Sequence, residues 1–126
     1  MTQRQILLTG TVLGLLGVAL GAFGAHALKP MLTASGRVDT YELAVRYQFY
    51  HAFALLATGL AMAKETHQLF RLAGGCFLAG VVLFSGSLYA MAITQTNTVA
   101  LVTPVGGLFL LAGWALLAVG VHRMYK

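Results

Sequence analysis

The feature that most constrains this chain is a series of four long apolar stretches separated by short polar connectors. The stretches cover about residues 6–28, 43–63, 72–93 and 99–121. A transmembrane helix needs about 20 consecutive apolar residues, and backbone groups in lipid must find hydrogen-bond partners within the chain itself. The four stretches therefore predict an all-α integral membrane protein, built as a bundle of four transmembrane helices.

Length and composition leave little else for the chain to form. It has 126 residues, of which 59% are hydrophobic and 9% charged, whereas an average soluble domain is about 45–50% apolar and about 25% charged. We therefore predict a single membrane domain over residues 1–126, with no separate soluble catalytic domain. The connectors at 29–40, 64–71 and 94–98 carry the turn-forming residues and most of the charges.

The first 27 residues also resemble a secretory signal peptide. Arg4 precedes the apolar run, and Ala25-His26-Ala27 fits an A-x-A cleavage site. The run nevertheless extends to Phe23, beyond the typical signal-peptide core of about 7–15 residues, and it carries a regular glycine pattern. We expect a retained first helix.

Charge predicts the orientation in the membrane. An even number of spans puts both termini on one side, and that side has more bases than the other. The termini side holds Arg4, Lys64, Arg71, Arg123 and Lys126, and the opposite side holds Lys29, Arg37 and Arg46. Lysine and arginine accumulate on the cytoplasmic side, so we expect both termini in the cytoplasm of a bacterial inner membrane. The net charge of +5 is spread singly among apolar runs, without the dense patch that nucleic-acid binding needs.

Glycines recur on the first and last apolar stretches at helical spacing. The first stretch has Gly10, Gly14, Gly17, Gly21 and Gly24, and the last has Gly106, Gly113 and Gly120. Small residues along one stripe let neighbouring membrane helices approach closely. We interpret both stripes as helix-packing faces within the bundle; contact between copies of the chain, or close approach to a flat cofactor, are the alternatives.

Polar side chains of the apolar stretches gather toward the expected outer face. The candidate site residues are His26, Glu42, Arg46, Gln48, His51, Ser85, Ser87, Tyr89 and Thr103. Glu42 and Arg46 are four residues apart, which suits a helical ion pair, and Gln48 and His51 share a helix face. Ionisable residues within a membrane are costly and suggest a functional site. The alternatives are an interfacial ion pair, an aromatic belt and a structural hydrogen-bond cluster.

Five motifs lie in order along the chain, and most fall on this polar cluster. They are LGAFGAH at 20–26, YQxxH at 47–51, LFSGSLY at 83–89, TPVGG at 103–107 and AGW at 112–114. Together they resemble the YgdD-like family of small bacterial inner-membrane proteins, also called domain of unknown function four-two-three, with transmembrane protein two-five-six as a eukaryotic relative. The resemblance covers about residues 14–121. It implies a small four-span membrane protein and no particular reaction.

Two functional hypotheses follow. The first is a binding or transport protein that holds a small polar or anionic ligand, or a lipid headgroup, in an outward-facing polar pocket. The second is a structural or accessory subunit of a larger membrane complex, or a homo-oligomer. We predict no catalytic residues and no metal or other cofactor. Haem held by His26 and His51 has weak support, a serine hydrolase lacks a carboxylate to orient its base, and the lone Cys76 excludes a disulfide within the chain.

Overall fold

The computed structural model describes all residues from Met1 to Lys126, and every regular element in it is a helix. The prediction of an all-α fold is confirmed. The five helices are α1 (Gln3–Ala25), α2 (Lys29–Ser35), α3 (Val38–Lys64), α4 (Gln68–Thr94) and α5 (Val102–Met124). The four long helices coincide with the four apolar stretches, within a few residues at each end.

The connector expected at 29–40 is more structured than the sequence suggested. Most of it forms α2, with Pro30 in its first turn, where the missing N–H of proline costs nothing. Gly36 ends α2 with φ 68, a left-handed conformation that glycine adopts without steric penalty. Asp39 then lies in the first turn of α3, where a negative charge interacts favourably with the helix dipole. This helix therefore begins at Val38 and not at residue 43.

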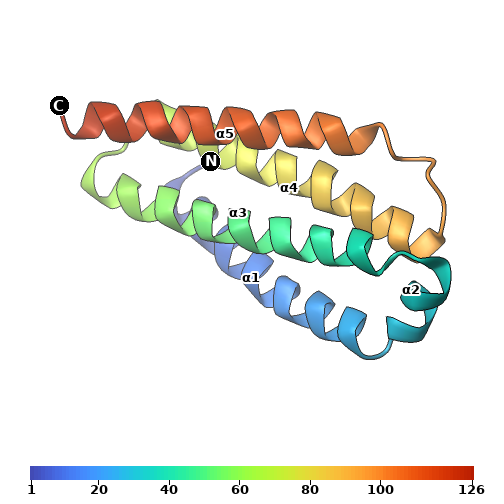
Figure 1. Ribbon diagram of the computed structural model, residues 1–126. Coiled ribbons are helices and arrows are strands. Elements are labelled where there is room, and N and C mark those ends of the chain that lie inside the picture. The colour runs from blue at the N-terminus through green and yellow to red at the C-terminus, as the bar shows by residue number, and fades with distance from the viewer.

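The long helices pack side by side in the order α1, α3, α4, α5 (Figure 1). The central helix α3 packs against α1 on one side and α4 on the other, and α5 packs chiefly against α4. Neighbouring helices run in opposite directions, so α1 begins and α5 ends at the same end of the array, away from α2 (Figure 1). The arrangement is an open layer whose edges are α1 and α5, rather than a closed ring of four helices.

Glycines spaced seven residues apart let α1 approach α3. A Cβ atom on Gly17 would lie 2.8 Å from the Phe49 ring, and one on Gly10 would lie 3.0 Å from the Ala52 carbonyl oxygen. Gly24 makes the same kind of close approach to the ring of Tyr41. The two intervening glycines differ, because Gly14 faces open space and Gly21 meets its neighbour at ordinary van der Waals distance.

The contact between α5 and α4 has the same design, but here the glycines belong to the helix that comes later in the chain. Gly106, Gly113 and Gly120 of α5 lie against Phe84, Phe77 and Phe70 of α4. Added Cβ atoms at Gly113 and Gly120 would each come within 2.7 Å of a phenylalanine ring. Both helix pairs thus combine a glycine stripe on an outer helix with large side chains on a central helix, a packing mode typical of membrane proteins.

Three helices are long and apolar enough to cross a membrane: α1, α4 and α5. The helix α3 is as long as α4, with 27 residues, but its first half is more polar and contains Asp39, Glu42, Arg46 and Gln48. The fourth span and the location of the termini stay predictions at this point.

Candidate functional site

Gln48 joins three helices near the middle of the layer. Its side-chain nitrogen Nε2 donates to the Leu13 carbonyl oxygen of α1 at 2.8 Å, and its Oε1 accepts from the Tyr89 hydroxyl of α4 at 2.7 Å. The Gln48 side chain is only 3% exposed. Burial of an amide without partners is costly, and here both ends of the amide are hydrogen-bonded.

Further buried polar groups hold α3 and α5 to their neighbours. The Ser85 hydroxyl of α4 donates to the Ala44 carbonyl oxygen of α3 at 2.8 Å. The hydroxyls of Ser87 in α4 and Thr103 in α5 bond to each other. No buried side-chain nitrogen or oxygen in the chain lacks a hydrogen-bond partner, so this set of contacts is complete without any ligand.

His51 lies at the midpoint of α3 and is bonded at both ring nitrogens. The indole nitrogen Nε1 of Trp114 lies 3.1 Å from His51 Nε2, and the Tyr47 carbonyl oxygen lies 2.7 Å from His51 Nδ1. An indole N–H can only donate and a carbonyl can only accept. Nε2 must therefore be the unprotonated nitrogen and Nδ1 must carry the hydrogen, so the ring is a neutral imidazole in a defined tautomer.

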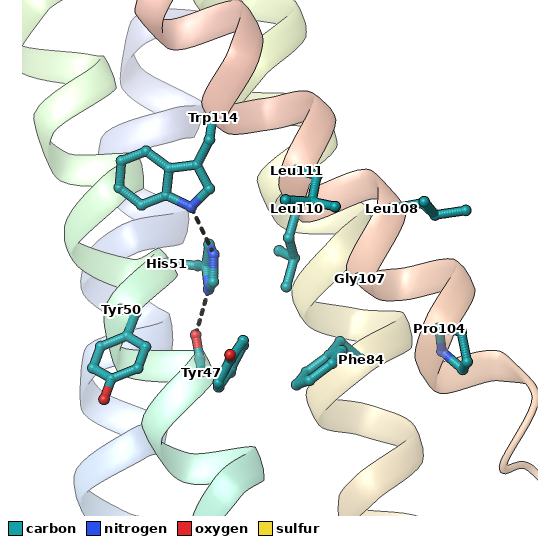
Figure 2. Close-up of a pocket in the computed structure, with 10 residues that line it drawn as sticks. All are labelled: Tyr47, Tyr50, His51, Phe84, Pro104, Gly107, Leu108, Leu110, Leu111 and Trp114. Atoms are coloured by element: carbon teal, nitrogen blue, oxygen red, sulfur yellow. Dashed lines mark hydrogen bonds between the residues drawn. The ribbon is translucent and has the colours of Figure 1, made fainter.

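A cleft of about 580 Å³ opens between α3 and α5 beside this pair (Figure 2). Its walls are mainly apolar and aromatic. The lining residues are Tyr47, Tyr50, His51, Phe84, Pro104, Gly107, Leu108, Leu110, Leu111 and Trp114. The volume lies within the range of about 300–1,000 Å³ that is typical of small-molecule sites. The cleft lies in the half of the layer that contains α2 and the start of α5.

Trp114 spans the cleft at one end. Its indole is 47% exposed and packs edge-on against Phe77, with ring centroids 5.3 Å apart. Its bond to His51 is the only hydrogen bond that joins α3 to α5. The Tyr47 ring stacks on Phe84 with centroids 4.5 Å apart, and both rings line the cleft.

A second, smaller groove of about 230 Å³ lies between the end of α1, α2 and the start of α3. Glu42 and Arg46 both line it and are both exposed, but they form no ion pair within 4.0 Å. The favourable spacing of these two residues therefore does not lead to the expected bridge.

The structure does not gather the candidate residues into one pocket. His51 alone of them borders the larger cleft, and Glu42 and Arg46 line the separate groove. Five other candidates form hydrogen bonds between helices: Gln48, Ser85, Ser87, Tyr89 and Thr103. His26 is exposed at the end of α1. In place of the single polar pocket expected from the sequence, the structure has a mainly apolar cleft, in which His51 is the one candidate residue.

Trp114 is the hydrogen-bonding partner of His51 in the cleft, and it was not among the predicted site residues, although it is the one tryptophan of the chain. Its place near the middle of an apolar stretch was a usable indication, since a buried or half-buried indole N–H needs an acceptor. The chain has no group of three or more His, Cys, Asp or Glu side chains that could hold a metal ion. Both ring nitrogens of His51 take part in hydrogen bonds.

An all-helical chain with several membrane-capable helices and interhelical hydrogen bonds between them is a small multi-pass integral membrane protein. The family model described as a protein of unknown function, DUF423, matches residues 20–107. The chain therefore belongs to the DUF423 family, and the resemblance inferred from its motifs is confirmed.

Individual relatives agree with this assignment. The chain is 40% identical to the UPF0382 inner membrane protein YgdD of Escherichia coli K12, over 100% of this chain and 95% of the relative. It is 36% identical to the UPF0382 membrane protein SSP2132 of Staphylococcus saprophyticus, over 97% of this chain and 100% of the relative. These names support a location in the inner membrane, and they state no reaction. No solved structure matches the chain.

Proposed function

We propose that α3 is a fourth transmembrane helix and that both termini face the cytoplasm. At 1.5 Å per residue its 27 residues span about 40 Å, enough for a hydrocarbon core of about 30 Å. Two polar residues in the central part of this helix, Gln48 and His51, are each 3% exposed and do not face lipid. The chain also has to return from the end of α1 to the start of α4, and α3 makes that connection.

We further propose that the cleft between α3 and α5 binds an amphiphilic molecule that enters from the bilayer. The observation that carries this proposal is a cleft of about 580 Å³ with aromatic and aliphatic walls between two helices that otherwise barely touch. Such a surface is favourable for a hydrocarbon chain. The hydroxyls of Tyr47 and Tyr50 form no hydrogen bond within the protein, so they are free to bond to polar atoms of a ligand.

A bilayer amphiphile fits this cleft better than a small anion does. None of its ten lining residues carries a full charge, and Arg46, the candidate for an anion contact, lines the other groove. The proposal involves binding or transfer without a chemical step, because Ser85 and Ser87 already hydrogen-bond to other groups and lie outside the cleft lining.

The experiment is native mass spectrometry of the full chain purified in a mild detergent. We expect bound amphiphile on the wild-type protein and its loss in Gly107→Leu, since Gly107 lines the cleft and a leucine side chain would enter it. Gly14→Leu is the matched control, because a Cβ atom there meets nothing within 4 Å. Equal amphiphile occupancy in both variants would contradict binding in this cleft.

A structural or accessory role is the second candidate. It is favoured by the complete internal pairing of the buried polar side chains, which accounts for them without a ligand. In that case, purification in a mild detergent should recover a partner protein in fixed stoichiometry, and the Gly107→Leu variant should retain it. Repeated recovery of this chain alone would count against that role.

A further inference from the structure

We infer that the amphiphile bound in the cleft carries a hydroxyl group, which inserts between Trp114 and His51. This inference rests on the proposed function of the cleft and names the headgroup chemistry that the cleft selects. It follows from the direction of one hydrogen bond and from the position of that bond in the cleft wall.

The direction of the Trp114–His51 bond is fixed by chemistry. Trp114 Nε1 can only donate, so His51 Nε2 accepts with its lone pair at 3.1 Å. The other ring nitrogen, Nδ1, is held by the Tyr47 carbonyl oxygen at 2.7 Å. That second bond keeps the tautomer fixed, so Nε2 continues to be an acceptor when Trp114 moves away.

The position of the bond makes it replaceable. Both residues line the cleft (Figure 2), and this bond is the direct polar link across it. The indole of Trp114 is half exposed, whereas His51 is buried behind it. A ligand that parts the two rings leaves one donor, the indole N–H, facing one acceptor, the imidazole lone pair.

A group that enters this space must accept from Trp114 and donate to His51 at the same time. A hydroxyl group does both through its single oxygen. An ether or ester oxygen can only accept, and it would leave the buried Nε2 without a partner, which is costly in an apolar site. An ammonium group can only donate, and it would leave the indole N–H unpaired. Of these headgroups, the hydroxyl is therefore the one that keeps both ring nitrogens satisfied.

The test compares two probes with the same chain, dodecanol and dodecyl methyl ether, by titration of the full-length protein in detergent micelles. Trp114 is the one tryptophan of the chain, so its emission reports on the cleft directly. We expect both probes to change the emission and dodecanol to bind about tenfold more tightly, the order expected when one analogue leaves a buried acceptor unpaired.

Variants assign this preference to His51. In His51→Leu the two probes should bind with about equal affinity, and binding of the ether should be retained. His26→Leu, which removes an exposed histidine outside the cleft, should keep the full preference. The wild-type comparison of the two probes stands by itself if His51→Leu does not fold.

The outcomes separate the two proposals. Equal affinity of dodecanol and the ether for the wild-type protein, or an unchanged preference in a folded His51→Leu variant, would overturn the hydroxyl inference and leave the cleft as a binding site. No emission change with either probe would overturn binding in the cleft itself.

Discussion

The contact between α4 and α5 at Gly106 gives the sharpest prediction about stability. A Cβ atom placed on Gly106 would lie 2.8 Å from the Cα of Phe84 and 2.9 Å from the carbonyl carbon of Leu83. Both are backbone atoms, which cannot rotate away as a side chain can. Because carbon atoms pack at about 3.5–4.0 Å, Gly106→Ala forces the two helices apart by about 1 Å.

The magnitude follows from a comparison with a second glycine. Overpacking of a close contact costs about 1–3 kcal/mol, and a rigid backbone neighbour favours the upper part of that range. Replacement of a helical glycine by alanine also gains about 1 kcal/mol of helix propensity. Gly14→Ala has the gain without the clash, since nothing lies within 4 Å of its added Cβ. We therefore expect Gly106→Ala to be less stable than Gly14→Ala by about 2–3 kcal/mol.

The assay is equilibrium unfolding of the purified variants in mixed micelles, with an increasing fraction of denaturing detergent, followed by far-ultraviolet circular dichroism and Trp114 emission. Wild type, Gly14→Ala and Gly106→Ala are compared under one protocol, so that the helix-propensity term common to both variants cancels. Equal free energies of unfolding for the two variants would refute the argument that backbone contact at Gly106 determines the spacing of α4 and α5.

Three further predictions address the polar contacts and the topology. Removal of the Gln48 amide in Gln48→Leu should destabilise the protein, and part of the loss should be shared with Tyr89→Phe, because the two side chains bond to each other at 2.7 Å. A double-mutant cycle should give a coupling energy of about 0.6 kcal/mol, and at most about 1.7 kcal/mol, as found for hydrogen bonds in membrane proteins. Full additivity of the two substitutions would contradict this coupling. Trp114→Phe should lower the free energy of unfolding by about 1–3 kcal/mol, because it leaves the buried Nε2 of His51 without its partner; no loss, measured by circular dichroism in the same unfolding assay, would show that the bond is not formed in solution. In a Cys76→Ala background, single cysteines at Ser35 and Thr96 should react with a membrane-impermeant maleimide in intact cells, while one at Thr66 should react only after lysis; equal labelling at Ser35 and Thr66 would mean that α3 does not cross the membrane.

The helices were predictable because their lengths are set by runs of apolar residues, which the sequence displays directly. The short helix α2 was missed because Lys29-Pro30 and Gly36 lie in a connector, and proline and glycine are common in turns. Here they act as the first turn and the end of a seven-residue helix. The difference lies in local backbone geometry, since proline is compatible both with a turn and with the start of a helix.

The candidate site was predictable only in part, because its residues were chosen by polarity and depth. Depth correctly indicated that Gln48 and His51 need partners, and both have them. It could not indicate which partners, because these depend on the order of helices in the layer. Leu13 and Trp114 belong to helices that lie on opposite sides of α3, and only the three-dimensional packing brings each of them to its partner.

The distribution of contacts also determines which part of the layer can open. The two helices of the α4–α5 pair are joined by glycine contacts at Gly106, Gly113 and Gly120, and α3 is hydrogen-bonded to both α1 and α4 through Gln48. Across the cleft, by contrast, α3 and α5 share one hydrogen bond, from Trp114 to His51. Separation of these two side chains costs about 1–3 kcal/mol as long as the buried Nε2 has no new partner, and it leaves every glycine contact in place. The proposed entry of a bilayer molecule between α3 and α5 therefore requires movement of the Trp114 indole and leaves the glycine contacts between α4 and α5 unchanged.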